Sequence, residues 1–134
     1  MTDKFKSLKI AIIGLGYVGL PLALEFGKKR KVIGFDICKN RIKDLKLGID
    51  KNLEFDKSQI KSSKKINYTR DPKDLKQANC FIITVPTPID KFKKPDLRPL
   101  FEASKLVGKY LKRGNLIIYE STVYPGTTEE ICVP

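Results

Sequence analysis

The chain contains no histidine and no tryptophan, and only three cysteines, among its 134 residues. Without histidine the chain holds no histidine general base and no Ser-His pair, and the usual zinc sites are excluded as well. The cysteines at positions 38, 80 and 132 are too widely spaced for a disulfide framework or a zinc motif. We therefore expect no metal site and a reducing, cytoplasmic setting.

Long apolar runs are missing too. The run from Ile10 to Leu24 is interrupted by three glycines and a proline, so we expect neither a transmembrane helix nor a signal peptide. A hydrophobic share of 41% and a charged share of 31% are typical of a globular domain. The length suffices for one domain with its own core but not for two.

Acidic residues are scarce relative to basic ones: the chain has 15 Asp and Glu and 27 Lys and Arg, which gives a net charge of +12. A basic surface can attract nucleic acid, an anionic membrane or a phosphorylated ligand. Only five of the cations are Arg, and the Lys residues are scattered along the chain. Because readers of nucleic acid rely on Arg clusters and stacking aromatics, we expect a solvated surface with no nucleic-acid or membrane partner.

Short apolar runs alternate with helical patterns along the whole chain, which is typical of an α/β protein with a parallel sheet. We expect strands at 8–13, 31–36, 66–69, 81–85 and 116–119, and helices at 17–29, 38–47 and 96–113. Residues 51–65 are polar and predict a loop with a short helix, and Asp71-Pro72 opens another short helix. In the helix at 96–113, Asp96 is the expected N-cap and Leu100, Ala103, Val107 and Leu111 form the apolar stripe, before a stop at Gly114.

The last predicted element is a helix opened by a capping box from Thr127 to Glu130. Only a few residues follow it, and so short a helix buries almost nothing. We therefore expect residues 1–134 to be an incomplete domain from the front part of a longer protein.

Gly14, Gly16 and Gly19 form a G-x-G-x-x-G motif between an expected strand and an expected helix. Gly14 allows a tight turn, Gly16 lets the backbone touch a pyrophosphate, and Gly19 lets the helix lie close to the strand. The first N–H groups of the helix then face the pyrophosphate. The alternative is a plain turn, but strand, spacing and helix together favour a Rossmann-like doubly wound parallel sheet, truncated before completion.

Asp36 ends the second expected strand, 22 residues after Gly14. A carboxylate at that place accepts hydrogen bonds from the adenosine ribose hydroxyls and repels a 2′-phosphate. Lys39 and Arg41 follow closely, and a basic residue can accommodate a 2′-phosphate. Because Asp36 lies at the tip of the strand, the predicted cofactor is nonetheless NAD and not NADP.

Four blocks of sequence resemble one family: GLGYVGLPLAL at 14–24, GFDI at 34–37, VPTP at 85–88 and ESTVYPG at 120–126. They are similar, in the same order, to the UDP-glucose/GDP-mannose dehydrogenase family of nucleotide-sugar 6-dehydrogenases. The stretches 86–90, 94–97 and 119–130 look most like the branch that acts on UDP-N-acetylhexosamines. This resemblance implies oxidation of the sugar C6 alcohol to a carboxylate with two NAD⁺, for the biosynthesis of surface polysaccharides.

The resemblance also implies cofactor-binding roles for residues outside the glycine motif. Arg41 would reach the adenosine ribose or the adjacent phosphate, Thr87 would line the cofactor groove, and Thr122 would lie by the nicotinamide ribose. For the two threonines the alternative is a hydroxyl bonded to its own backbone, and for Arg41 it is a solvated helix position. The full set implied in this way is Tyr17 and Val18 through their backbone, Arg41, Pro86, Thr87, Ser121 and Thr122.

The cysteine nucleophile of the family and its proton-transfer partners have no match in this chain, so we assign no catalytic residue. All three cysteines are expected to be structural. The central helix, the domain that binds the UDP-sugar and the dimeric or higher assembly would belong to the full-length protein. By itself the domain should bind NAD weakly and turn nothing over. Two alternatives stay open: a dehydrogenase of the 6-phosphogluconate or 3-hydroxyacyl type, and a non-catalytic nucleotide-binding module.

Overall fold

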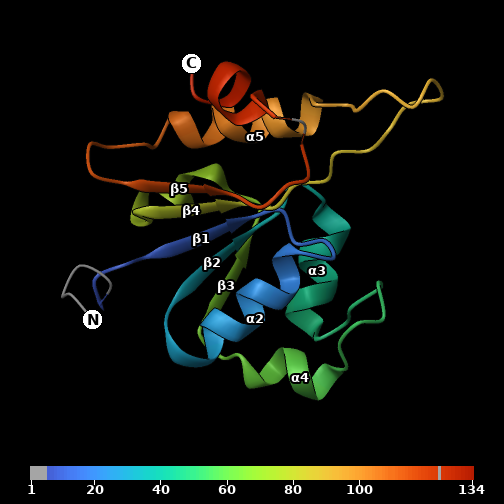
Figure 1. Ribbon diagram of the computed structural model, residues 1–134. Helices are drawn as coiled ribbons and strands as arrows, with labels where there is room; N and C mark the ends of the chain where they lie inside the picture. Colours follow the sequence, from blue (N-terminus) through green and yellow to red (C-terminus); the bar gives the residue numbers. More distant parts are fainter. Residues whose placement is uncertain (1–5, 124) are drawn as a thin grey trace.

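A computed structural model describes residues 6–123 and 125–134 and shows one parallel sheet. The order of its strands is β3-β2-β1-β4-β5 (Figure 1). Because the order changes direction between β1 and β4, a crevice opens there at the carboxyl ends of the strands. The expected doubly wound α/β sheet is confirmed, and its strands are β1 (Ile10–Ile13), β2 (Val32–Phe35), β3 (Ile66–Thr69), β4 (Cys80–Ile83) and β5 (Leu116–Tyr119).

Helices cover both faces of the sheet (Figure 1). One face carries α2 (Gly19–Lys29), α3 (Lys39–Leu47) and α4 (Lys57–Ser62). The other carries α5 (Arg98–Gly108) and the 3₁₀ helix η1 (Pro72–Gln77), with η2 (Thr128–Cys132) packed against α5. Within the described part of the chain, none of these helices has the length and apolar character needed to cross a membrane.

Two apolar clusters lie on the two faces of the sheet and meet at β1. Ile10 and Ile12 pack toward α2, whereas Ala11 and Ile13 pack toward α5. All four residues are buried, which explains why this strand is apolar at every position. Each fully buried large aliphatic side chain contributes roughly 1.5–3 kcal/mol, so β1 is the centre of the core.

The helix α4 shows how local signals act inside the polar segment 51–65. Asp56 Oδ1 accepts a hydrogen bond from the Gln59 N–H at 2.8 Å, and Gln59 Oε1 accepts one from the Asp56 N–H at 2.8 Å. This reciprocal pair is a capping box. The short helix that the sequence predicts there is confirmed, although its cap was not recognised.

The helix predicted over 96–113 is shorter than expected, and this part of the prediction was wrong. It ends at Gly108, where the Tyr110 N–H turns back to the Val107 carbonyl at 2.9 Å. Leu111 continues the apolar spacing, yet 43% of its surface is exposed because the core ends at Val107. At the start, the Asp96 carboxylate accepts from the Arg98 N–H at 3.0 Å, one residue before the N-cap position.

The capping box predicted from Thr127 to Glu130 is also wrong. Thr127 has helical backbone angles, φ −56° and ψ −44°, whereas an N-cap residue is extended. The Val133 N–H donates to the Thr128 carbonyl at 3.0 Å, which closes a wide π-type turn. Other element boundaries differ from the prediction by one or two residues.

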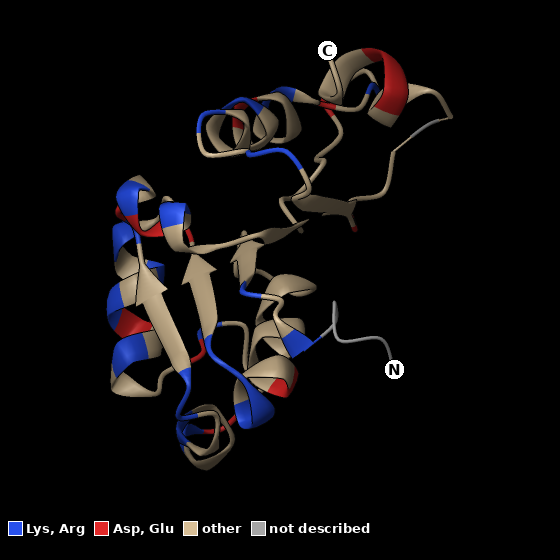
Figure 2. Cartoon of the chain, turned by 90° about the vertical axis from the view of Figure 1, so that its left-hand side faces the viewer, with Lys and Arg blue, Asp and Glu red and all other residues tan. Residues whose placement is uncertain are grey.

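Charged residues are spread over the helices and the loops (Figure 2). The central strands carry none, since β1, β2 and β4 read IAII, VIGF and CFII. The basic excess is therefore carried by the helices and the loops, as a solvated surface would be.

Candidate functional site

The glycine-rich turn after β1 is shaped by steric limits at two positions, Gly14 and Gly19. Gly14 has φ +97°, and a Cβ there would lie 3.1 Å from the Val85 nitrogen of the chain after β4. A Cβ on Gly19 would overlap the Gly14 carbonyl, so only glycine lets α2 start this close to the turn. Among the described residues, by contrast, no atom lies within 4 Å of a Cβ built on Gly16. Gly16 therefore leaves open space beside the backbone, where a ligand can approach.

Thr84, which sequence reasoning missed, fastens this turn to β4. Its hydroxyl is buried and lies 3.0 Å from the Ile13 carbonyl and 2.7 Å from the Gly14 carbonyl. The signal in the sequence is slight: one hydroxyl residue directly after the apolar run of β4. A buried hydroxyl needs such a partner, so its position at the end of a strand predicts a bond to neighbouring backbone.

Asp36 follows β2, and its two carboxylate oxygens accept hydrogen bonds from the glycine-rich turn and from the chain just before α3. Oδ2 accepts a hydrogen bond from the Leu15 N–H at 2.8 Å, and Oδ1 accepts one from the Cys38 N–H at 2.9 Å. Each oxygen keeps a lone pair for a further donor. The carboxylate is thus held rigidly at the strand end with capacity left to accept from ligand hydroxyls.

Arg41 lies in α3, and its guanidinium links two loops. Nε donates to the Leu15 carbonyl at 2.7 Å, and Nη1 donates to Asp50 Oδ1 at 2.6 Å. The side chains of Arg41 and Asp50 are 12% and 0% exposed, so the alternative of a solvated helix position is wrong. The implied contact between Arg41 and the adenosine ribose or phosphate stays a prediction.

Burial and hydrogen bonding act in opposite directions on the Asp50 carboxyl. Burial raises the pKa of this carboxyl. The hydrogen bonds from Arg41 and from the N–H groups of Asn52 and Glu54, together with the charge of Arg41, lower the pKa by more than burial raises it. The pKa of Asp50 therefore lies below its ordinary value of 3.8. The Arg41–Asp50 pair is consequently ionic at neutral pH.

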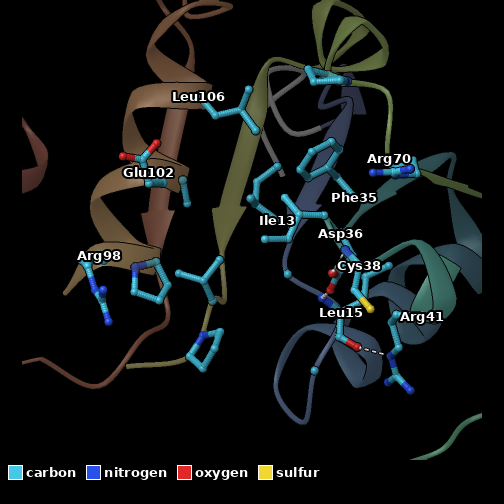
Figure 3. A pocket seen from close by; sticks show the side chains of 18 of the residues that line it. Ile13, Leu15, Phe35, Asp36, Cys38, Arg41, Arg70, Arg98, Glu102 and Leu106 are labelled. Atoms are coloured by element: carbon cyan, nitrogen blue, oxygen red, sulfur yellow. Dashed lines mark hydrogen bonds between the residues drawn. The ribbon is translucent and has the colours of Figure 1, made fainter. Parts of the chain in front are cut away.

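A pocket of about 840 Å³, the strand-end pocket, opens where the strands end (Figure 3). It lies between the glycine-rich turn with β2 on one side and α5 on the other. Figure 3 shows Asp36, Cys38 and Arg41 on the first side and Arg98 and Glu102 on the second. Its walls are formed by 13–16, 35–38, Arg41, Asn52, Arg70, Pro72, Val85, Pro86, and the face of α5 that carries Arg98, Pro99, Glu102, Ala103, Lys105, Leu106 and Lys109.

Five of the predicted site residues line the strand-end pocket, and six do not. The structure brings together Gly14, Gly16, Asp36, Arg41 and Pro86 there. The described residues that line it do not include Tyr17, Val18, Gly19, Thr87, Ser121 or Thr122.

The residues that sequence reasoning missed lie mainly on α5. Four charged residues follow one another at spacings of four, three and four, which places them on one side of a helix: Arg98, Glu102, Lys105 and Lys109. That spacing is present in the sequence, alongside the apolar stripe of the same helix.

The loops after β4 and β5 bind each other. The Thr87 hydroxyl donates to the Thr122 carbonyl at 2.7 Å, and the Ser121 hydroxyl donates to the Val85 carbonyl at 2.7 Å. Neither hydroxyl is bonded to its own turn, so the alternative considered for Thr87 is not what the structure shows. Tyr124 of the same block lies outside the described residues.

The three cysteines differ in their surroundings. Cys80 is buried in β4, and burial raises the pKa of its thiol. Cys132 is partly buried against α5, whereas Cys38 is exposed and lines the strand-end pocket. Cys38 thus departs from the expectation of a structural side chain. Over 6–123 and 125–134, no group of three His, Cys, Asp or Glu gathers as a metal site.

The residues of the strand-end pocket fit a dinucleotide. The open space at Gly16 admits a phosphate against the backbone, and the fixed Asp36 carboxylate suits ribose hydroxyls. Buried Arg41 Nη2 has no hydrogen-bond partner among the described residues, so its N–H groups remain available as donors. Five basic side chains against two acidic ones line the pocket, which favours an anionic ligand.

Comparison with known proteins agrees with this geometry. The model of the UDP-glucose/GDP-mannose dehydrogenase family, NAD binding domain, matches residues 8–134. UDP-N-acetyl-D-glucosamine 6-dehydrogenases of Pseudomonas aeruginosa and Salmonella typhi are 59% and 57% identical, over 96% and 95% of this chain and 31% and 30% of theirs. A solved UDP-D-ManNAc dehydrogenase from Pyrococcus horikoshii is 39% identical with a TM-score of 0.86, over 92% of this chain and 31% of that one.

The chain therefore spans about a third of the length of the relatives it matches. The family match decides against a dehydrogenase of the 6-phosphogluconate or 3-hydroxyacyl type. The parallel sheet, the glycine-rich turn at its switch point and the acid at the tip of β2 agree with a family match over nearly all residues. The chain therefore belongs to the UDP-glucose/GDP-mannose dehydrogenase family and corresponds to the NAD binding domain of that family.

Proposed function

We propose that this chain is the NAD⁺-binding part of a nucleotide-sugar 6-dehydrogenase. The enzyme oxidises the C6 alcohol of a UDP-N-acetylhexosamine to the uronic acid with two NAD⁺, for surface polysaccharide biosynthesis. The observation that carries the cofactor assignment is the strand-end pocket, where open space at Gly16 lies beside the fixed Asp36 carboxylate. Identity of 59% to a UDP-N-acetyl-D-glucosamine 6-dehydrogenase supports the class of sugar.

Bound NAD⁺ supplies the hydride acceptor, and the chain's own residues hold it. The turn at 14–16 sets the backbone against the pyrophosphate, while the first N–H groups of α2 add the positive end of a helix. The side chains of Tyr17 and Val18 are 67% and 47% exposed and do not line the strand-end pocket, so we assign their contact with the pyrophosphate to their backbone. Asp36 accepts from the ribose hydroxyls and disfavours a 2′-phosphate by charge.

The loops after β4 and β5 form the other half of the proposed cofactor site. Pro86 lines the strand-end pocket, and Thr87, Ser121 and Thr122 lie in the adjoining loops. These loops leave the carboxyl ends of parallel strands, where open α/β sheets bind ligands. We assign them to the nicotinamide side, and the bond-breaking groups to parts of the enzyme outside residues 1–134.

The proposal is tested on the natural gene product that contains these residues. Formation of NADH is measured with UDP-N-acetylglucosamine, with UDP-glucose and GDP-mannose as control substrates and NADP⁺ as control cofactor. We expect two NADH per UDP-N-acetylhexosamine, and weak turnover with NADP⁺. Binding of NAD⁺ with no turnover of any nucleotide sugar would refute the enzyme assignment and leave a nucleotide-binding module.

Two further properties follow from the proposed activity. A dimer or higher assembly of the full-length protein is expected, and light scattering coupled to gel filtration measures it directly. Because NAD⁺ and UDP-sugars are cytoplasmic metabolites, we place the enzyme in the cytoplasm. A monomer in solution, or recovery of the protein outside the cytoplasmic fraction, contradicts the corresponding expectation.

A further inference from the structure

Asp50 organises the loop after α3 around its own carboxylate. Oδ1 accepts from Arg41 Nη1 at 2.6 Å and from the Asn52 N–H at 3.1 Å. Oδ2 accepts from the Glu54 N–H at 3.0 Å and from the Phe55 N–H at 3.2 Å. Four donors thus converge on one side chain that is fully buried. Nothing in the dinucleotide motif requires an acid at this place.

The same network reaches the glycine-rich turn. Arg41 Nε donates to the Leu15 carbonyl at 2.7 Å, while the N–H of Leu15 is bound by Asp36. Leu15 is therefore held on both sides, and its side chain is fully buried as well. The backbone between Gly14 and Gly16 has its orientation set by two charged side chains on neighbouring elements.

We propose that Asp50 is a positioning residue for dinucleotide binding. It fixes the guanidinium of Arg41, which in turn holds the Leu15 carbonyl so that the turn presents its backbone to the pyrophosphate. Asp50 also places Asn52 in the wall of the strand-end pocket. This inference rests on the proposed NAD⁺-binding function and extends it to a residue outside the motif.

The chemistry of the pair explains why these residue types are used. A buried guanidinium without a counter-charge is strongly unfavourable, and Asp50 supplies that charge. A planar guanidinium projects its donors in fixed, different directions, so one side chain serves both Asp50 and Leu15. A lysine ammonium in place of Arg41 keeps the charge but lacks the fork that spans the two acceptors.

The experiment compares Asp50→Asn, Arg41→Lys and the double variant in the natural gene product. The Kd for NAD⁺ is measured by calorimetry, and KM is measured for NAD⁺ and for UDP-N-acetylglucosamine. Asp44→Asn is the matched control, since Asp44 lies in α3 like Arg41 but forms its ion pair with the exposed Lys51. Each single variant should weaken NAD⁺ binding about tenfold, as expected for a lost charge-assisted hydrogen bond. KM for UDP-N-acetylglucosamine should change less than about twofold in these variants. In Asp44→Asn the Kd for NAD⁺ should also change less than about twofold.

The double variant separates positioning from general destabilisation. If Asp50 acts through Arg41, the two substitutions together weaken NAD⁺ binding by less than the product of their single effects. Folded Asp50→Asn protein that binds NAD⁺ like the unsubstituted protein overturns the proposal. Should Asp50→Asn fail to fold, Arg41→Lys decides, and unchanged NAD⁺ affinity in that variant overturns the proposal as well. An unsubstituted protein without affinity for NAD⁺ refutes the proposed function itself.

Discussion

The two halves of the proposed cofactor site, the β1–β2 side in the strand-end pocket and the adjoining β4–β5 loops, hold their polar groups in different ways. On the β1–β2 side, Asp36 and the Arg41–Asp50 pair bind backbone groups of the glycine-rich turn or each other. On the β4–β5 side, Ser121 and Thr87 donate to carbonyls of the neighbouring loop at 2.7 Å each. The first side consists of partly or fully buried charges, and the second of uncharged hydroxyls nearer the surface.

This difference bears on how ready each side is for a ligand. A carboxylate oxygen that accepts one N–H still accepts a ribose hydroxyl, so Asp36 binds without giving up a partner. A hydroxyl has a single proton, and Thr87 has already donated it to Thr122. The β1–β2 side is therefore preorganised, whereas Thr87 must exchange its partner before it donates to a cofactor.

The largest expected effect comes from an added methyl group in the glycine-rich turn. In Gly19→Ala the new Cβ overlaps the Gly14 carbonyl and lies 2.5 Å from the Thr84 hydroxyl. The backbone has to shift, and we expect a loss of at least about 3 kcal/mol of unfolding free energy together with NAD⁺ binding. Chemical denaturation and calorimetry measure the two effects.

Gly16→Ala is the matched partner of this variant. Its Cβ meets open space among the described residues, so the free energy of unfolding should change by less than about 0.5 kcal/mol. NAD⁺ binding should still be lost, because the methyl group occupies the place proposed for the pyrophosphate. Full NAD⁺ affinity in Gly16→Ala contradicts that placement.

A second large effect is expected at Asp50 and depends on pH. Asp50→Asn removes the charge that faces Arg41 but keeps an acceptor oxygen, so we expect a loss of about 2–3 kcal/mol at neutral pH. Because the folded-state pKa of Asp50 is lowered, its contribution is present above its ordinary value of 3.8 and disappears as the pH falls through the folded value. Stability curves of the two proteins should therefore converge below about pH 4, and a constant gap down to acid pH contradicts this account.

Residues with a local steric or chemical requirement could be predicted from the sequence. Gly14 and Gly19 are needed because a Cβ has no room, and Asp36 is recognisable at the end of an apolar strand. The strands themselves follow from apolar runs that are buried on both faces. For these features a few residues that are neighbours in the sequence determine the local structure.

Features that depend on chain segments meeting in space could not be predicted in this way. Arg41 and Asp50 both lie in a polar stretch, and only the turn after α3 brings their side chains together. Thr84 looks like any residue in an apolar run until the glycine-rich turn packs beside it. Leu111 fits the helical spacing, but the length of the core and not the spacing ends α5.

Removing the Asp36 carboxylate tests the preorganised β1–β2 side of the proposed cofactor site. Asp36→Ala deletes the acceptor for the Leu15 and Cys38 N–H groups and for the ribose. We expect NAD⁺ affinity to fall about 10- to 100-fold, the size of one or two charge-assisted hydrogen bonds. NADP⁺ should lose less, because the repulsion of its 2′-phosphate disappears with the charge. Equal losses for the two cofactors would show that Asp36 only shapes the turn.

The smallest effects are expected on the β4–β5 side. Ser121→Ala and Thr87→Val each remove one hydroxyl–carbonyl bond, a contribution of about 0.5–1.5 kcal/mol, with Thr87 at the lower end because its bond is exposed. NAD⁺ affinity should change less than about threefold in either variant, since each hydroxyl is already committed to a carbonyl. Thermal unfolding and NAD⁺ titration measure both quantities, with Ser104→Ala on α5 as a control for the loss of a partly buried hydroxyl. A tenfold loss of NAD⁺ affinity in Thr87→Val but not in Ser104→Ala means that the cofactor displaces the Thr122 carbonyl, and both halves of the proposed cofactor site then take part in binding.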